Sequence, residues 1–245
     1  MSALESVVRL AWDTFRFSTN DKAGLLQKVK EIQGRAAALK IEDVGITEWQ
    51  VKKLGPEREQ GCAEIRAPVG YIEVFEDDLL AVGAFMLKSN VAMPLHNHPT
   101  MHGVLKVLHG SVKIKSFDIL EKGSDEKLPF FRNSDFQPSL EDLEKLRFSS
   151  ESEYTVDSEP CLVTPVEGNI HCLESVGGPA IFLDFISPPY NPSLGRDCYY
   201  YKELTVDEDD PNFDKNVVWA KQIECPRTYY CVKLDYLGPE IDMDK

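Results

Sequence analysis

The sequence has no long apolar run. Its 245 residues never reach 18 consecutive apolar positions, the length at which a membrane-spanning helix becomes the expected structure. The first residues, Met1 to Arg9, also lack a basic stretch followed by an apolar run, so we expect no secretory signal. These absences predict a protein without a membrane anchor.

Positive charge is scarce. Lysine and arginine number 27 against 41 aspartate and glutamate residues, which gives a formal net charge of −14. Nucleic acids and anionic membranes attract clustered lysine and arginine, and they repel a surface this acidic. We therefore predict no nucleic-acid partner and no membrane partner.

Cysteines are too few, and too far apart, for a disulfide scaffold. Six are present, at positions 62, 161, 172, 198, 225 and 231, and no pair has the CxxC spacing. The interpretation is free thiols in a reducing compartment. We expect a cytoplasmic protein, with the nucleus as an open alternative.

The chain changes character along its length. Apolar residues recur at helical spacing over residues 3–41, whereas from Tyr71 onward short β-branched and aromatic runs alternate with glycine, proline and asparagine. This predicts a helical N-terminal segment over residues 1–55 flanking a mainly β barrel or sandwich domain over residues 56–245. Two separate domains are the alternative. Strands are predicted at residues 71–75, 79–87, 104–108, 112–117, 161–164, 170–173, 180–186, 199–204, 217–219 and 229–234.

Residues 121–153 are mostly polar and charged. We interpret them as an excursion from the barrel. Within them, residues 139–146 predict a short helix, because Ser139 and Asp142 have the spacing of a capping box.

The histidines are the strongest chemical signal. Only five are present, and His96, His98, His102 and His109 lie within 14 residues. On a strand, residues i and i+2 point to the same side, so His96 and His98 can direct two imidazoles into one cavity. A third ligand must come from elsewhere, and His171, which follows a glycine turn, could reach across the barrel. Imidazole suits Fe, Zn, Cu and Ni.

The clustered histidines also have explanations that involve no metal. An HxH pair can occur by chance on a surface strand, His109 has the position of a solvated turn residue, and His102 can be a neighbour of the site rather than part of it.

Several separate sequence segments resemble one protein family. The string from Pro94 to Gly103, PLHNHPTMHG, resembles the first metal motif of a cupin. Together with CLVTP at 161–165, GPAIFLDFISPPY at 178–190 and GRDCYY at 195–200, it is similar to the cysteamine (2-aminoethanethiol) dioxygenase and plant cysteine oxidase group. The resemblance implies a cupin-type double-stranded β-helix, or jelly-roll. The glutamate that general cupins carry four or five residues after the second histidine is absent.

The resemblance also implies a function. In this family Fe(II) is held by three histidines, which here are His96, His98 and His171. O2 and the metal would convert cysteamine to hypotaurine, and N-terminal cysteines of proteins to sulfinates that feed an oxygen-dependent N-degron pathway. The family also implies a monomer.

Four further residues match family positions. Asp184 would hold the substrate amine or a water, although strand alternation could instead put it on a solvated face. Tyr190 resembles the active-site tyrosine, the alternative being a loop tyrosine that packs on prolines. Cys198 and Tyr200, which share a face at i and i+2, resemble the partners of a Cys–Tyr thioether, and the alternative is ordinary core packing.

Two other functions stay open. One is a cupin metalloenzyme that acts on a non-thiol substrate, and the other is a cupin module that binds without turnover.

Overall fold

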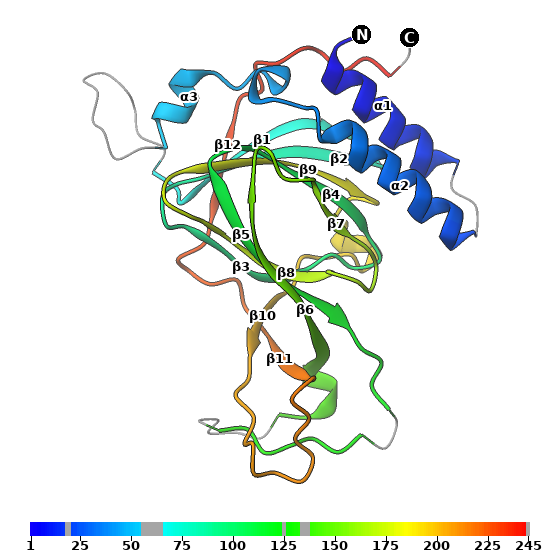
Figure 1. The fold of residues 1–245 in the computed structure, drawn as a ribbon, viewed down its shortest axis with the longest axis vertical. Helices are drawn as coiled ribbons and strands as arrows, with labels where there is room; N and C mark the ends of the chain where they lie inside the picture. The colour runs from blue at the N-terminus through cyan, green and yellow to red at the C-terminus, as the bar shows by residue number, and fades with distance from the viewer. Residues whose placement is uncertain (18–20, 55–65, 124–125, 133–137, 244–245) are drawn as a thin grey trace.

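The computed structural model describes residues 1–17, 21–54, 66–123, 126–132 and 138–243. The twelve strands of this described part belong to two six-stranded sheets (Figure 1). In spatial order, the first sheet contains β12 (Cys231–Leu234), β1 (Val69–Glu76), β2 (Ala81–Leu87), β9 (Ala180–Ser187), β4 (His102–His109) and β7 (Cys161–Val163). The second contains β10 (Tyr200–Glu203), β11 (Val218–Ile223), β6 (Leu143–Thr155), β5 (Ser111–Ile119), β8 (Ile170–Ser175) and β3 (Ala92–Asn97).

The second sheet closes on itself, because Tyr200 of β10 pairs with His96 of β3. The result is the mainly β, cupin-type architecture that the sequence predicts, with helices at the N-terminal end of the chain.

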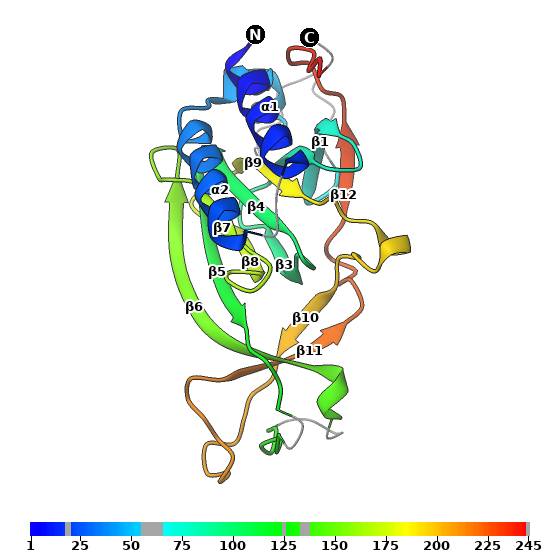
Figure 2. The same cartoon turned by 90° about the vertical axis from the view of Figure 1, so that its right-hand side faces the viewer.

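Helices α1 (Ala3–Arg16) and α2 (Lys22–Ala36) cover one face of the first sheet (Figure 2). Ser2 and Glu5 form a capping box at the start of α1, and the apolar side of that helix packs in one core with β2, β4 and β9. The Trp12 indole also donates a hydrogen bond to Asp77 at 2.7 Å. A 3-10 turn (Ile41–Val44) and the short α3 (Glu48–Lys52) follow, and the predicted boundary between 55 and 56 lies outside the described residues.

Strand β9 lies between β2 and β4 in the first sheet and is buried along its whole length. Its odd-numbered residues, Ile181, Leu183 and Phe185, pack in the core beneath the helices. Because side chains alternate along a strand, Phe182, Asp184 and Ile186 point the other way, into the barrel. A strand covered on both faces has no solvated side.

The predicted helix over residues 139–146 is wrong beyond its first turn. A 3-10 turn (Leu140–Asp142) does begin at Ser139, but β6 follows from Leu143 and pairs with both β5 and β11. Leu140, Leu143 and Leu146 have helical spacing, yet two of them are buried by strand partners. Residues 143–153, the last third of the predicted excursion over 121–153, are therefore sheet.

At one end of the second sheet, β6, β10 and β11 extend into a smaller lobe, where Phe131, Leu143 and Trp219 form a separate apolar cluster (Figure 1). Cys161, Cys172, Cys198, Cys225 and Cys231, the cysteines in the described part of the chain, are all free thiols. Among the described residues, no helix combines the length and apolar character needed to cross a membrane.

A substitution at Gly110 tests how closely the β4–β5 turn packs against the backbone of Pro179. Its φ is +69°, and a Cβ there would collide with the carbonyl of Pro179. Gly177 has nearly the same φ, +70°, but open space around it. We expect Gly177→Ala to cost about 1–2 kcal/mol through backbone strain alone, and Gly110→Ala to cost clearly more. Chemical denaturation measures both, and equal losses would contradict the close approach.

Candidate metal centre

The ladder between β3 and β8 brings the histidines together. In its antiparallel register His96 lies opposite His171, and Asn97 lies opposite Ile170. The third histidine, His171, therefore lies on the strand adjacent to β3. The expectation that it reaches the other two from across the barrel is wrong. His98 lies one residue past the end of β3. The candidate ligand atoms of the three imidazoles lie within 4.8 Å of one another.

The three imidazoles fit a metal ion. All are buried, with exposed fractions of 6, 3 and 2% for His96, His98 and His171. The Nε2 atoms of His98 and His171 are 3.0 Å apart. Two ligands bound about 2.1 Å from an ion at a right angle have a separation of about 3 Å. His171 Nδ1 is buried without a hydrogen-bond partner.

Electrostatics keep these side chains neutral. Burial lowers the pKa of His96, and it holds the pKa values of His98 and His171 well below their usual range. A neutral imidazole is the form that binds a metal. Within the described part of the chain, the group contains no carboxylate, so the donor set is three nitrogens.

Hydrogen bonds orient two of the rings. His96 Nδ1 lies 2.8 Å from the Pro94 carbonyl oxygen. The Tyr190 hydroxyl donates to the Asn97 carbonyl at 2.8 Å and lies 3.0 Å from His98 Nδ1. Because the hydroxyl proton goes to the carbonyl, Nδ1–H of His98 can donate to the hydroxyl oxygen. That tautomer leaves the Nε2 lone pair facing His171.

A cavity of about 180 Å³ opens beside the histidines. Its walls are largely apolar and aromatic, and its lining consists of Phe85, Met93, His96, His98, Leu105, His171, Leu173, Phe182, Asp184, Ile186, Tyr190, Cys198, Tyr200 and Tyr229. All seven residues proposed from the sequence lie on this list. The structure therefore brings them together around one space.

A second, more open cavity of about 250 Å³ adjoins the first. The two share Phe85, Asp184, Ile186 and Tyr190 as lining residues, and the second adds Tyr71 and Glu76. The space beside the histidines thus continues toward the surface over β1 and β2.

Among the described residues, Asp184 is the one carboxyl-bearing residue that lines the cavity beside the histidines, the inner cavity. Its position on β9 directs it inward, so the solvated-face alternative does not hold. Burial raises the pKa of Asp184 to about 7, so protonated and ionised forms are both accessible near neutral pH. A cation in the cavity would favour the ionised form.

Cys198 and Tyr200 meet at the cavity wall. Cys198 precedes β10 rather than lying on it, and its side chain lines the same cavity as those of Tyr190 and Tyr200. Burial raises the pKa of Cys198 to about 11, so the group is a thiol. The Tyr200 ring lies 6.5 Å from the His96 ring, centroid to centroid.

The two remaining histidines lie elsewhere. The His102 ring contacts Phe15 of α1, with centroids 6.2 Å apart, on the helix-covered side of β4. His109, at the other end of that strand, borders a surface pocket with Ile46 and Thr47. Neither histidine lines the cavity.

Sequence reasoning missed Asn97, the middle residue of the HxH motif. Its Nδ2 donates to the Tyr201 hydroxyl at 3.1 Å, and its Oδ1 accepts from the Tyr199 backbone N–H at 2.9 Å. These bonds tie β10 to β3 and set Tyr200 beside His96. Its place between two inward-facing histidines carried no signal of this role.

Comparisons with known proteins place this geometry in context. A family model described as PCO_ADO matches residues 36–241. The 2-aminoethanethiol dioxygenase of Mus musculus is 32% identical, over 98% of this chain and 96% of its own length. The Homo sapiens protein of the same name is 37% identical, over 71% and 68%. Plant cysteine oxidase 1 of Arabidopsis thaliana is 29% identical, over 74% and 57%.

Tyr190→Phe tests the orientation of His98. Removing the hydroxyl leaves His98 Nδ1 and the Asn97 carbonyl without this partner, so we expect metal affinity to fall about 10- to 100-fold. Metal loss during dialysis against a chelator measures the effect. Tyr230→Phe is the matched control, since its exposed hydroxyl also bonds one carbonyl, that of Arg66. Equal retention in both variants would contradict the role of Tyr190.

Asp184 predicts a pH dependence in the metal-free protein. Its folded pKa, about 7, lies above the unfolded value of about 3.9, so the folded state binds the proton more tightly. The free energy of unfolding should therefore fall as pH rises from about 4 to 7, by at most about 4 kcal/mol. Asp184→Asn should flatten that slope in urea titrations. A slope unchanged by the substitution would refute the buried carboxyl.

Proposed function

The chain belongs to the PCO_ADO family of thiol dioxygenases, and we propose that it uses Fe(II) and O2 to convert a thiol to a sulfinate. His96, His98 and His171 hold the metal in this proposal. The substrates are cysteamine and the N-terminal cysteine of peptides and proteins. The observation that carries the proposal is the buried group of three neutral imidazoles beside a cavity. Among the residues that the structure describes, that group contains no carboxylate and Asp184 is the one carboxyl that lines the cavity.

The charge of the ligand set favours this chemistry. Fe(II), when bound, supplies the redox capacity and a double positive charge that three neutral ligands leave uncancelled, which favours a thiolate substrate. Both atoms of one O2 enter the product, so RSH and O2 balance RSO2H without another reductant. The largely apolar and aromatic walls limit the contact of a bound substrate with water.

Asp184 provides the counterpart for the amine. Cysteamine and an N-terminal cysteine share an ammonium group two carbons from the sulfur. A carboxylate in the same cavity as the histidines can accept hydrogen bonds from that ammonium and so set the direction of the thiol. The cation in turn favours the ionised form of Asp184.

The adjoining cavity supports a peptide substrate. Cysteamine needs only the inner space, whereas an N-terminal cysteine must let the following residues leave it. The outer cavity begins at Asp184 and Tyr190 and is more open, so it offers that exit. For a protein substrate, we propose that the sulfinate marks the N-terminus for an N-degron pathway, which would make protein lifetime depend on O2.

Mass spectrometry of a short peptide tests the reaction. The peptide carries a free N-terminal cysteine and is incubated aerobically with the Fe(II)-loaded protein, beside the same peptide N-acetylated. We expect two oxygen atoms to be added to the free-amine peptide alone, and cysteamine to compete. His171→Ala should lose iron and activity together.

Each contrary result has a distinct meaning. Oxidation of cysteamine but of neither peptide would remove the protein substrate from the proposal. Iron bound at full occupancy, with no oxidation of any of these thiols, would contradict the dioxygenase assignment. An active, iron-loaded His171→Ala variant would contradict the ligand set.

A further inference from the structure

We infer that Asn169 is a positioning residue for the metal centre, and that Asp118 and Arg147 fix it from strands β5 and β6. The inference rests on the proposed binding of a metal by the three histidines. It concerns how His98 is held, because His98 is the candidate ligand that lies beyond the end of a strand.

The backbone pairing of β3 with β8 ends one residue before His98. Its last pair joins Asn97 to Ile170, and the next position in the same register sets His98 opposite Asn169. There the Asn169 side chain takes the place of a backbone partner. Its Oδ1 accepts from the His98 N–H at 3.3 Å, and its Nδ2 donates to the His98 carbonyl at 2.7 Å. Asn169 is fully buried.

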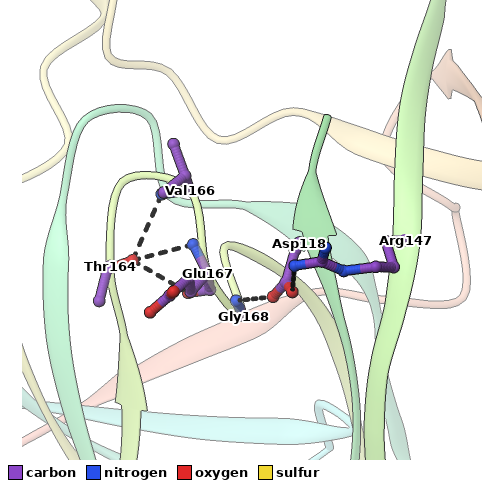
Figure 3. Close-up of polar contacts among 6 residues, drawn as sticks. All are labelled: Asp118, Arg147, Thr164, Val166, Glu167 and Gly168. Carbon is purple, nitrogen blue, oxygen red and sulfur yellow. Dashed lines mark hydrogen bonds and ion pairs between the residues drawn. The ribbon is translucent and has the colours of Figure 1, made fainter. Parts of the chain in front are cut away.

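The turn before β8 holds Asn169 in place. Asn169 Nδ2 also donates to the Thr164 carbonyl at 2.8 Å. The Thr164 hydroxyl oxygen accepts from the backbone N–H groups of Val166, at 3.4 Å, and Glu167, at 2.9 Å (Figure 3). Gly168 completes the turn with φ +59°. The amide of Asn169 therefore bridges this turn and the backbone of His98.

Asp118 anchors the turn to the barrel. One of its carboxylate oxygens accepts from the Gly168 N–H at 2.9 Å, and the other accepts from the Arg147 guanidinium at 2.8 Å (Figure 3). Burial opposes the charge, but the hydrogen bonds from Arg147 and Gly168 hold the pKa of Asp118 below its usual value. Hydrogen bonds to an ionised acceptor are the stronger kind.

The contacts form one chain from the surface to the metal centre. Arg147 is more than half exposed, Asp118 is buried, and Gly168 and Asn169 link that carboxylate to the His98 backbone. The 3.0 Å spacing of the His98 and His171 Nε2 atoms depends on where that backbone lies. A displacement of a few tenths of an ångström would alter the ligand geometry, so the chain should control metal affinity.

Co²⁺ binding to the full chain tests this inference. Affinity is measured by competition with a chelator, and the ligand geometry is read from the visible spectrum of bound Co²⁺. Asn169→Asp keeps an oxygen toward the His98 N–H but sets an oxygen against two carbonyls, so we expect affinity to fall about 10- to 100-fold with a changed spectrum. Asp118→Asn should cause a smaller loss in the same direction.

Glu126→Gln is the matched control. Glu126 forms an ion pair with Lys145 at 2.7 Å, and Lys145 lies on β6, as Arg147 does. In the part of the chain that the structure describes, neither side chain of this pair bonds to the turn, so Co²⁺ affinity should stay within about twofold of the unsubstituted protein. Circular dichroism and thermal unfolding of the metal-free variants separate global destabilisation from a local effect.

The outcomes are distinguishable. If Asn169→Asp does not fold, Asp118→Asn and the exposed Arg147→Gln carry the test. Unchanged affinity and spectrum in the folded variants would overturn the inference and leave the proposed function standing. An equal loss in Glu126→Gln would also overturn it. An unsubstituted protein that binds no Co²⁺ would overturn the metal site and the inference together.

Discussion

The antiparallel pairing of β3 with β8 is the constraint on which the site depends. It sets His96 directly opposite His171 and brings His98 within reach of both. The fold buries all three rings, which makes their charged forms costly and keeps their lone pairs available. Tyr190 and Asn169 approach His98 from the side chain and from the backbone, so its position is determined twice.

Charge is distributed unequally between the surface and the cavity. The chain has a net charge of −14, whereas the inner cavity combines three neutral imidazoles with the single carboxyl of Asp184 among the described residues. In the proposed reaction, a divalent cation and an aminothiol zwitterion enter this space, and Asp184 faces the ammonium while the metal faces the sulfur. Because electrostatic interactions strengthen where water is excluded, the single carboxyl of Asp184 is enough to bind the substrate ammonium in this proposal.

The sequence predicted most of the strands from their residue pattern, and the seven residues proposed from histidine spacing and from the family resemblance line one cavity. β-branched runs between turn residues mark strands, and a scarcity of histidines makes His171 conspicuous. It failed at residues 139–146, where leucines at helical spacing belong to a strand and its preceding turn. It also could not show that Tyr190 bonds His98 or that Asn169 completes the ladder, since both contacts depend on strand register rather than on local pattern.

Anomalous diffraction at the iron absorption edge, from crystals of the Fe(II)-loaded protein, tests the central claim most directly. The account predicts one strong peak about 2 Å from an imidazole nitrogen of each of His96, His98 and His171, with no carboxylate among the protein ligands. An iron peak elsewhere, an iron ligated by Asp184, or no iron between the three imidazoles would contradict it.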